Sequence, residues 1–590
     1  MYDTGCPPTS ACCGRVARYC TTALTDDPIA SRTPPGDIPD VEADSAAATP
    51  DARDVPGAPG RWGLNALTLA IGLAAIGAAL AAVTFRSFDL DRFFVPKELA
   101  LHTGALIAAL VLAAWRGERR YTVADLGLMA WLALSAVSAL LATSGWHARR
   151  ALAISLSAAV IYWAAAALRR AERSRGVTLL IAAAATAAVA SALAQAYGYD
   201  SELFSTNRAP GGTLGNRNFI AHVAAMSLPV FVFLTATARS GAGSLIGAAA
   251  ILAASAALVL SRTRAAWLAL AIWLVIAIPV AWSGRAVIRT AIPPRRGLLL
   301  AGALAVGAAM ALLIPNTLDW KSDSPYLDSV RDVVNYREGS GAGRLKQYTN
   351  SLRIARAHPL FGVGPGNWAA EYPGYVSRGD PSLLESTGMT ANPWPSSDWV
   401  AAVAERGIPA ALAMATLLLA LIANAWKGWR DSVYPSVDRF GAFAGGSAVL
   451  IGVIQGGFDA FTLLAFPSVL FWGVAGALIP ASRPVVTVGV GSRARVYLIG
   501  ATALVWLVFV ARSAGKIEAM RLYSKGTVDS IREAASYDPG SYRIQLRAAQ
   551  LLADRGMCRL AYHNAMSATS LFPRAAAPQA ILAKCAGSER

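Results

Sequence analysis

Charged residues are scarce in this chain of 590 residues. Asp, Glu, Lys and Arg together make up 15% of it and hydrophobic residues 55%, whereas a soluble domain usually carries about 25% charged residues. So few charges cannot give a soluble protein of this size a polar surface. The composition therefore excludes a soluble enzyme, a disordered scaffold and a nucleic-acid-binding protein, and it predicts a polytopic membrane protein.

Cysteine is also rare, and six residues do not make a disulfide scaffold. Four of them lie near the N-terminus: Cys6, Cys12, Cys13 and Cys20. Their spacing matches no zinc pattern and no histidine lies among them, so incidental cysteines are favoured over a metal site. Cys558 and Cys585 could form a disulfide if the C-terminal segment lies in an oxidising compartment. We expect neither a metal nor a cofactor.

Long apolar runs are abundant. A bilayer core about 30 Å thick needs roughly 20 apolar residues for each helix. Thirteen segments qualify: 62–85, 98–115, 123–143, 148–168, 177–197, 219–238, 245–260, 265–282, 298–314, 400–425, 440–458, 463–479 and 496–510. The predicted fold class is all-α, a polytopic membrane bundle of 12–13 transmembrane helices with a large extracytoplasmic loop and a small helical C-terminal module.

The short loops indicate the orientation of the bundle. With the N-terminus in the cytoplasm, the cytoplasmic short loops carry twice as many Arg and Lys residues as the loops on the opposite side. Residues 315–399 then form an outer loop of the transmembrane domain 61–512, and the C-terminus is periplasmic. Residues 1–60, rich in Pro, Ala and Asp, are expected to be a disordered cytoplasmic tail. The predicted location is the bacterial inner membrane.

The C-terminal segment 513–590 contains a short internal repeat. Residues 533–539 (Glu-Ala-Ala-Ser-Tyr-Asp-Pro) resemble residues 567–573 (Ser-Ala-Thr-Ser-Leu-Phe-Pro) at an offset of 34 residues. This spacing is typical of a tetratricopeptide unit, which binds protein partners. A plain helical cap is the alternative interpretation.

Polar groups on the expected outer side point to an anionic substrate. Arg262 and Arg264 lie at the outer junction of two predicted helices, and a guanidinium group can bind two phosphate oxygens at once. The alternative is that both side chains reach toward lipid headgroups. Residues 343–356 read as an amphipathic helix. Two glycine-rich turns, 211–218 and 358–368, could present backbone N–H groups to an anion or could simply be compact loops.

Six motifs in this order resemble the O-antigen ligase and O-antigen polymerase superfamily over roughly residues 62–480. They lie at residues 94–98, 212–218, 261–267, 344–367, 398–409 and 456–461. The resemblance implies metal-independent, inverting transfer of a glycan from undecaprenyl pyrophosphate at the outer membrane face. The acceptor would be a hydroxyl of lipid A core, of another glycan or of a protein, and membrane lipids would surround the enzyme.

The resemblance also implies roles for single residues. Arg262 and Arg344 match the family's phosphate-binding arginines, Arg264 lies beside them, and Asn216 and Asn218 match a short polar turn. Where the family usually has a histidine that activates the acceptor, this chain has Ser396.

Three other residues are candidates for the missing general base: Asp398, Glu405 and His358. The other histidines are interpreted as structural: His102, His147, His222 and His563.

Several functions stay open at this point. Ligase, polymerase and protein glycosyltransferase share these motifs. A non-catalytic membrane assembly protein for surface polysaccharide is a second possibility, and a secondary transporter is a third. Transporters commonly show repeated halves with broken helices, and no such repeat is visible here.

Overall fold

A computed structural model describes residues 60–320, 322–331, 333, 339–377, 379–384 and 386–586. Twelve of its helices are long and apolar enough to cross a membrane. They are α1 (Arg61–Leu80), α2 (Asp91–Ala114), α3 (Val123–Leu140), α4 (Gly145–Arg170), α5 (Ser174–Ala196), α6 (Arg217–Ala236), α7 (Gly241–Ser261), α8 (Arg264–Ser283), α10 (Pro294–Leu313), α14 (Asp398–Arg430), α15 (Ser436–Gly456) and α17 (Ser492–Ser524). The apolar helix α16 (Ala465–Leu478) has 14 residues. Each of the thirteen predicted segments overlaps one of these helices, which confirms the all-α polytopic bundle.

Small side chains let the central helices pack closely, as is common in membrane bundles. A Cβ atom added at Gly476 of α16 would lie 2.4 Å from the backbone oxygen of Tyr162 in α4, and one at Gly104 of α2 would lie 2.5 Å from that of Ala70 in α1. Helices α4 and α6 are the most enclosed, whereas α8, α10 and α17 are mostly uncovered by the rest of the chain. The uncovered apolar helices present their side chains to lipid.

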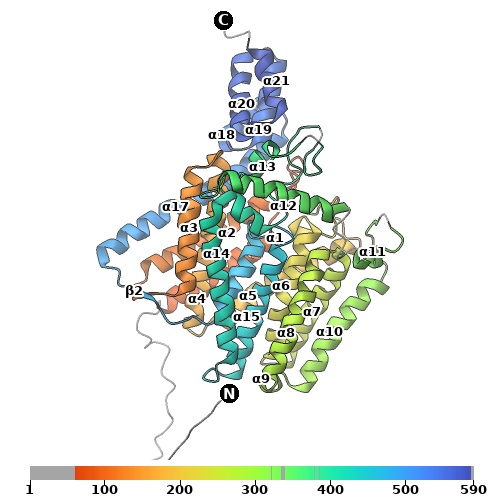
Figure 1. The fold of residues 1–590 in the computed structure, drawn as a ribbon, viewed down its shortest axis with the longest axis vertical. Coiled ribbons are helices and arrows are strands. Elements are labelled where there is room, and N and C mark those ends of the chain that lie inside the picture. The colour runs from red at the N-terminus through yellow and green to blue at the C-terminus, as the bar shows by residue number, and fades with distance from the viewer. Residues whose placement is uncertain are drawn as a thin grey trace, which may run out of the picture. The chain divides into compact units, whose positions relative to one another are not determined.

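Short elements occupy the two ends of the bundle (Figure 1). At one end, β1 (Arg119–Tyr121) pairs antiparallel with β2 (Val486–Val488), and α9 (Arg285–Ala291) follows α8. At the other end lie five short elements: η1 (Gly212–Leu214), α11 (Pro325–Arg331), α12 (Gly339–Ala357), α13 (Trp368–Glu371) and η3 (Tyr372–Gly374). Helix α12 contains the predicted segment 343–356 and confirms that it is helical, but Leu345 and Leu352, two of its apolar residues, are exposed, while Gln347 and Asn350 are buried.

The C-terminal module lies at the same end as α12 (Figure 1). It consists of α18 (Val528–Tyr537), α19 (Tyr542–Asp554), α20 (Cys558–Leu571) and α21 (Ala576–Cys585). A disulfide joins Cys558 and Cys585, the pairing that the sequence left open. Helix α17 runs without a break through residue 512, where the sequence placed the domain boundary. The tetratricopeptide interpretation stays a prediction, and the four N-terminal cysteines, with residues 1–59, lie outside the described residues.

Candidate functional site

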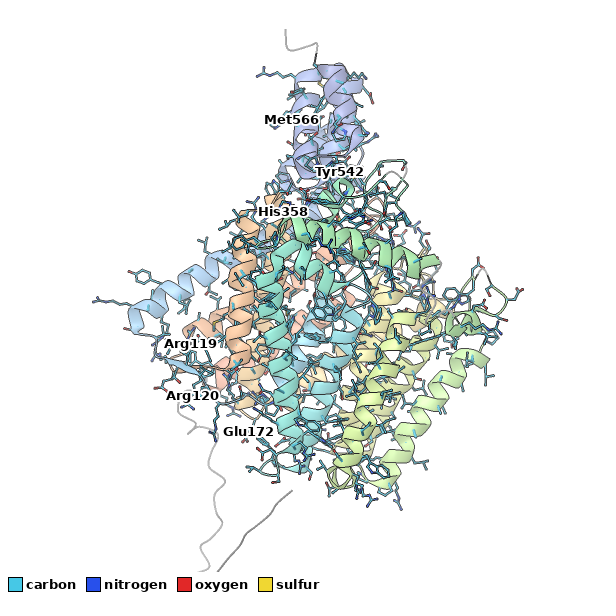
Figure 2. The ribbon with its side chains drawn as sticks, viewed as in Figure 1. Arg119, Arg120, Glu172, His358, Tyr542 and Met566 are labelled. Atoms are coloured by element: carbon cyan, nitrogen blue, oxygen red, sulfur yellow. A yellow bond between two sulfur atoms is a disulfide. The ribbon has the colours of Figure 1, made fainter. Side chains whose placement is uncertain are left out.

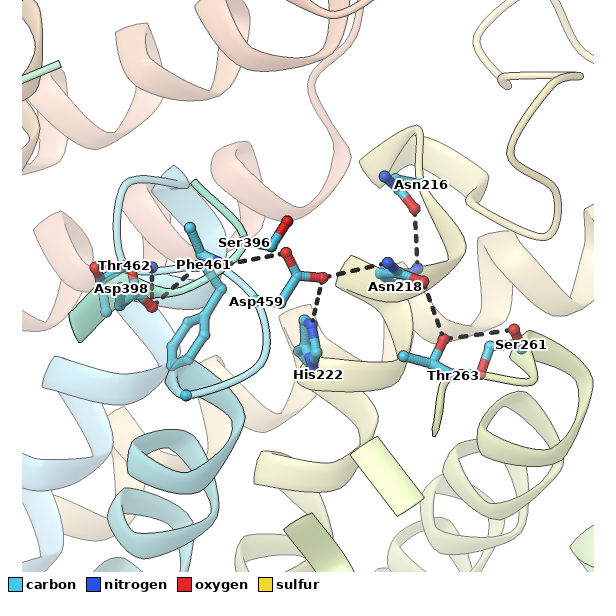
Figure 3. Close-up of polar contacts among 12 residues, drawn as sticks. Asn216, Asn218, His222, Ser261, Thr263, Ser396, Asp398, Asp459, Phe461 and Thr462 are labelled. Carbon is cyan, nitrogen blue, oxygen red and sulfur yellow. Dashed lines mark hydrogen bonds and ion pairs between the residues drawn. The ribbon is translucent and has the colours of Figure 1, made fainter. Parts of the chain in front are cut away.

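Four segments far apart in the sequence meet at the end of the bundle that carries α12. They are the start of α6, the α7–α8 junction, the start of α14 and the loop between α15 and α16. Figure 3 shows their polar side chains joined by hydrogen bonds. We call Asn218, His222, Thr263 and Asp459 the Asp459 cluster.

Asp459 is the centre of this cluster. Its Oδ2 accepts a hydrogen bond from Asn218 Nδ2 at 3.2 Å and lies 3.2 Å from His222 Nε2, and its Oδ1 accepts from the backbone N–H of Ala460 at 2.9 Å. The residue is 8% exposed. Burial alone would raise the pKa of Asp459, but the hydrogen bond and charge of His222, the charge of Arg344 and the Ala460 N–H outweigh it and lower the pKa. The carboxylate is therefore ionised at neutral pH.

The turn before α6 sets the position of Asn218. Gln195 Oε1 accepts hydrogen bonds from the N–H groups of Gly211 and Gly212, at 2.9 Å and 2.8 Å. Asn216 then caps the helix, because its side chain accepts from the Asn218 N–H at 3.0 Å. Thr263 donates to Asn218 Oδ1 at 3.3 Å, so Asn218 bridges the α7–α8 junction and Asp459.

The α7–α8 junction directs two neighbouring side chains to different partners. Arg262 adopts a left-handed backbone conformation (φ 52°), and its Nε donates to Ser329 Oγ of α11 at 2.9 Å. Its guanidinium carbon lies 4.6 Å from the ring centre of Trp320, and that of Arg217 lies 5.0 Å from the same centre. Arg262 thus faces the segment between α10 and α12, while Thr263 faces Asn218. Arg264 is the first residue of α8 and is half-buried.

Helix α12 brings Arg344 near Asp459, close enough for its charge to lower the pKa of that carboxyl. One turn further on, the Tyr348 hydroxyl lies 2.6 Å from the backbone oxygen of Ser396 and 3.1 Å from that of Gly457. The Ser396 N–H donates to the side chain of Gln347 at 2.7 Å. These contacts join α12 to the segment before α14 and to the loop between α15 and α16. Ser396 lies beside Asp459 in Figure 3.

Asp398 holds the loop that carries Asp459. It is 5% exposed. Its carboxylate accepts from the Phe461 N–H at 3.1 Å, the Thr462 N–H at 3.3 Å and the Thr462 hydroxyl at 2.6 Å. With three donors on its two oxygens, Asp398 is arranged to position the loop between α15 and α16.

Comparison with known families bears on the same region. Residues 248–415 match the family model described as O-antigen ligase. Residues 248–415 are therefore similar to an O-antigen ligase domain. This family indicates glycosyltransferase or ligase activity in surface polysaccharide biosynthesis, with a lipid-linked glycan donor, in a multi-pass protein of the inner membrane. No curated protein matches the sequence.

The matched stretch includes Thr263, Arg344 and Asp398 but ends before Asp459. It begins after Asn218 and His222. The Asp459 cluster is thus completed by segments on both sides of the match. Within the described ranges, no group of three or more His, Cys, Asp or Glu side chains could hold a metal ion.

Two candidates for the general base lie elsewhere in the matched stretch. Glu405 is 0% exposed, and its two oxygens accept from the backbone N–H groups of Gly366 at 2.8 Å and Trp368 at 3.2 Å. The glycine-rich turn therefore presents its N–H groups to a carboxyl group of the same protein. His358, labelled in Figure 2, is exposed, and its Nε2 lies 3.2 Å from the Tyr375 hydroxyl.

Sequence reasoning assigned no site role to three residues of the cluster: His222, Thr263 and Asp459. His222 was interpreted as structural, yet it lies one helical turn after Asn218, so both side chains face Asp459. Asp459 lies inside the motif 456–461, which contributed to the resemblance without receiving a role. The spacing of four residues between Asn218 and His222 was the one signal in the sequence that linked them.

Proposed function

We propose that this protein transfers a glycan from undecaprenyl pyrophosphate to an acceptor hydroxyl at the outer face of the inner membrane. The observation that carries the proposal is the Asp459 cluster. It joins an ionised carboxylate, a buried histidine and an amide, within the field of Arg344, in a chain whose residues 248–415 are similar to an O-antigen ligase domain.

The basic residues around the cluster suit the diphosphate of the donor. In the proposed reaction, the acceptor oxygen attacks the anomeric carbon of the glycan and the bond from that carbon to the phosphate oxygen breaks with inversion. Negative charge develops on the departing diphosphate, where the guanidinium groups of Arg344, Arg262 and Arg264 stabilise it. Asn218 orients the phosphate or the sugar, and Asn216 holds the turn that places it. Because the arginines supply this charge, the proposed mechanism needs no metal.

Asp459 is the proposed general base. It takes the proton of the acceptor hydroxyl as the new bond forms, and a positioned base typically contributes about 10²–10⁴-fold to the rate. His222 positions the carboxylate from its buried side. Asp459 and Asp398 each have three contacts, but all three donors on Asp398 belong to the loop that it holds, whereas two of the partners of Asp459 are side chains of the cluster. We therefore prefer Asp459 to Asp398, and we prefer it to Glu405 because that side chain is fully buried.

The disulfide supports the proposed orientation. Disulfides persist in oxidising compartments such as the periplasm, and Cys558 and Cys585 are joined. Phe572 of the C-terminal module packs with Trp368 and Tyr372 of the outer loop, so both segments lie on the same side of the membrane.

The test is a deletion strain complemented with variants of the full chain. Arg344→Ala should reduce transfer by about 10²–10³-fold, the usual cost of removing one stabilising group from a transition state. Arg356→Ala is the matched control, because Arg356 lies on the same helix and is exposed. Long chains that accumulate on the carrier lipid would indicate a ligase, and single repeat units would indicate a polymerase.

Full surface glycan in the Arg344→Ala strain would overturn the assignment of the site. If Arg344→Ala and Asp459→Asn both retain glycan while removal of the C-terminal module abolishes it, the non-catalytic assembly function is favoured. Uptake by purified protein in vesicles, independent of any glycan chain, would favour a transporter.

A further inference from the structure

A cavity of about 550 Å3 lies between the bundle and the C-terminal module. The outer ends of α2 and α4 form one side of it. Lys516 of α17 and Tyr542 at the start of α19 form another, together with Phe572. Tyr542, labelled in Figure 2, lies at the base of the C-terminal helices. The volume is within the range of ligand pockets, about 300–1,000 Å3.

Three aromatic rings connect this cavity to the Asp459 cluster. Phe219 follows Asn218 in α6, and Trp394 lies two residues before Ser396. The ring centres of Phe94 and Trp394 are 5.5 Å apart, and those of Phe94 and Phe219 are 6.1 Å apart. All three residues line the cavity, so a molecule bound there would lie beside residues that adjoin Asn218 and Ser396 in the sequence.

The charges of the cavity nearly cancel. Five basic and four acidic side chains line it. Arg150 is paired with Glu98 at 2.7 Å and with Asp91 at 2.8 Å. Lys516 lies within the field of Asp538 and these carboxylates and, within the described residues, has no ion-pair partner within 4 Å. A diphosphate needs a net positive site, whereas this lining supplies donors and acceptors in similar number, as a molecule with many hydroxyl groups requires.

The aromatic side chains add the second element of a sugar site. Tyr542 and Trp394 are only partly buried, so their rings border the cavity. A flat apolar ring beside hydrogen-bonding groups suits the two kinds of surface of a sugar, its C–H faces and its hydroxyl edges. Trp146 is less available, because the guanidinium groups of Arg149 and Arg512 lie 4.6 Å and 4.5 Å from its ring centre.

We propose that this cavity binds the sugar portion of the acceptor, and that the C-terminal module forms one wall of that site. The proposal rests on the proposed function, because it assigns the second substrate of the same reaction. The acceptor enters from the side of the C-terminal module, and its hydroxyl reaches Asp459 past Phe219 and Trp394, while the diphosphate of the donor remains with Arg344 and Arg262.

The test measures binding to the purified full-length protein in detergent. The probes are undecaprenyl diphosphate and two oligosaccharides from the parent strain, the lipopolysaccharide core and a surface-glycan fragment. Tyr542→Ala should weaken binding of one oligosaccharide by about tenfold and leave binding of undecaprenyl diphosphate unchanged. Tyr542→Phe retains the ring and should bind like the wild type. Arg547→Ala, an exposed change on the same helix, is the matched control.

The outcomes separate this proposal from the proposed function. Unchanged oligosaccharide binding in Tyr542→Ala, no binding of either oligosaccharide, or weakened binding of undecaprenyl diphosphate alone would each overturn the acceptor site. Displacement of the bound oligosaccharide by undecaprenyl diphosphate would also overturn it, since the cavity would then hold the donor. Arg344→Ala should lose undecaprenyl diphosphate and keep the oligosaccharide; if it keeps both, the donor site is wrong and the acceptor site stands.

Discussion

Replacing Asp459 with asparagine removes one negative charge from the candidate site and leaves its shape almost unchanged. The asparagine oxygen can still accept from Asn218 Nδ2 or from the Ala460 N–H, which lie 3.2 Å and 2.9 Å from the two carboxylate oxygens. The change removes the negative partner of His222 and the group that would receive the acceptor's proton. The rate of glycan transfer should therefore fall more than the stability of the folded protein.

The two effects differ in size. Loss of a general base lowers the rate about 10²–10⁴-fold, which corresponds to roughly 3–5 kcal/mol in the barrier at 1.36 kcal/mol for each factor of ten. Exchange of one acceptor for a donor in a buried site costs about 1–3 kcal/mol of stability. Asp459 is 8% exposed, and one of its three contacts can be kept by the asparagine oxygen, so we expect the lower half of that range.

The assay is glycan transfer by purified protein, with thermal unfolding of the same samples. Donor binding should persist in Asp459→Asn, because Arg344 and Arg262 are intact, while the rate falls by at least a hundredfold. A variant that retains more than a tenth of the wild-type rate would refute the role of Asp459 as the base. A collapse of thermal stability with proportional loss of donor binding would show that the residue is structural.

Four further outcomes follow from the geometry. The lowered pKa of Asp459 means that its stabilising contribution is present above the ordinary value of 3.8 and is lost as the pH falls below it, so the difference in melting temperature between the wild type and Asp459→Asn should shrink on acidification. Asp398→Asn places an N–H₂ group against the N–H donors of the loop and should cost about 1–3 kcal/mol, seen as a lower melting temperature together with slower transfer. Gly407→Ala should destabilise the protein by about 1–3 kcal/mol or more, because the residue has φ 83° and its new Cβ atom would lie 2.2 Å from the Leu360 oxygen. Gly500→Ala in α17 is the control: its Cβ atom would meet nothing within 4 Å, so the change should be neutral or stabilising. Cys558→Ser opens a disulfide that spans 27 residues and should cost about 3–4 kcal/mol of stability in the chain-entropy model. We expect faster proteolysis of α18–α21 in this variant. An unchanged rate of cleavage would show that the four helices are stable without the disulfide.

The membrane helices could be predicted because their signal is local. Twenty apolar residues identify a span whatever their neighbours are. Helix α12 could also be predicted from the pattern of its own residues. The end of α17 could not be found by this rule. Its last part carries Arg512, Lys516, Glu518 and Arg521, so the apolar run stops while the helix continues, supported by packing of Ala519 and Leu522 with Ala534 and Phe88.

The candidate site was only half visible because its partners are far apart in the sequence. Asn216 and Asn218 stood out in a glycine-rich turn, and Arg344 stood out on a predicted amphipathic helix. Asp459 is separated from His222 by 237 positions, and nothing local distinguishes a buried histidine that packs from one that faces a carboxylate. In the same way, a glycine turn shows that an anion can bind but cannot show that Glu405 already fills it.

The contact between Glu405 and the glycine-rich turn 358–368 holds the chain that follows α12 against α14. The carboxylate of α14 closes on two amides of the chain that leaves α12, and Glu405 and Gly364 are further linked through their backbones at 2.8 Å. The chain that follows α12 is therefore held beyond the C-terminal end of the helix, whereas Arg344 lies near its N-terminal end. The position of Arg344, a proposed ligand of the diphosphate, therefore depends in part on a contact that lies outside the proposed substrate site.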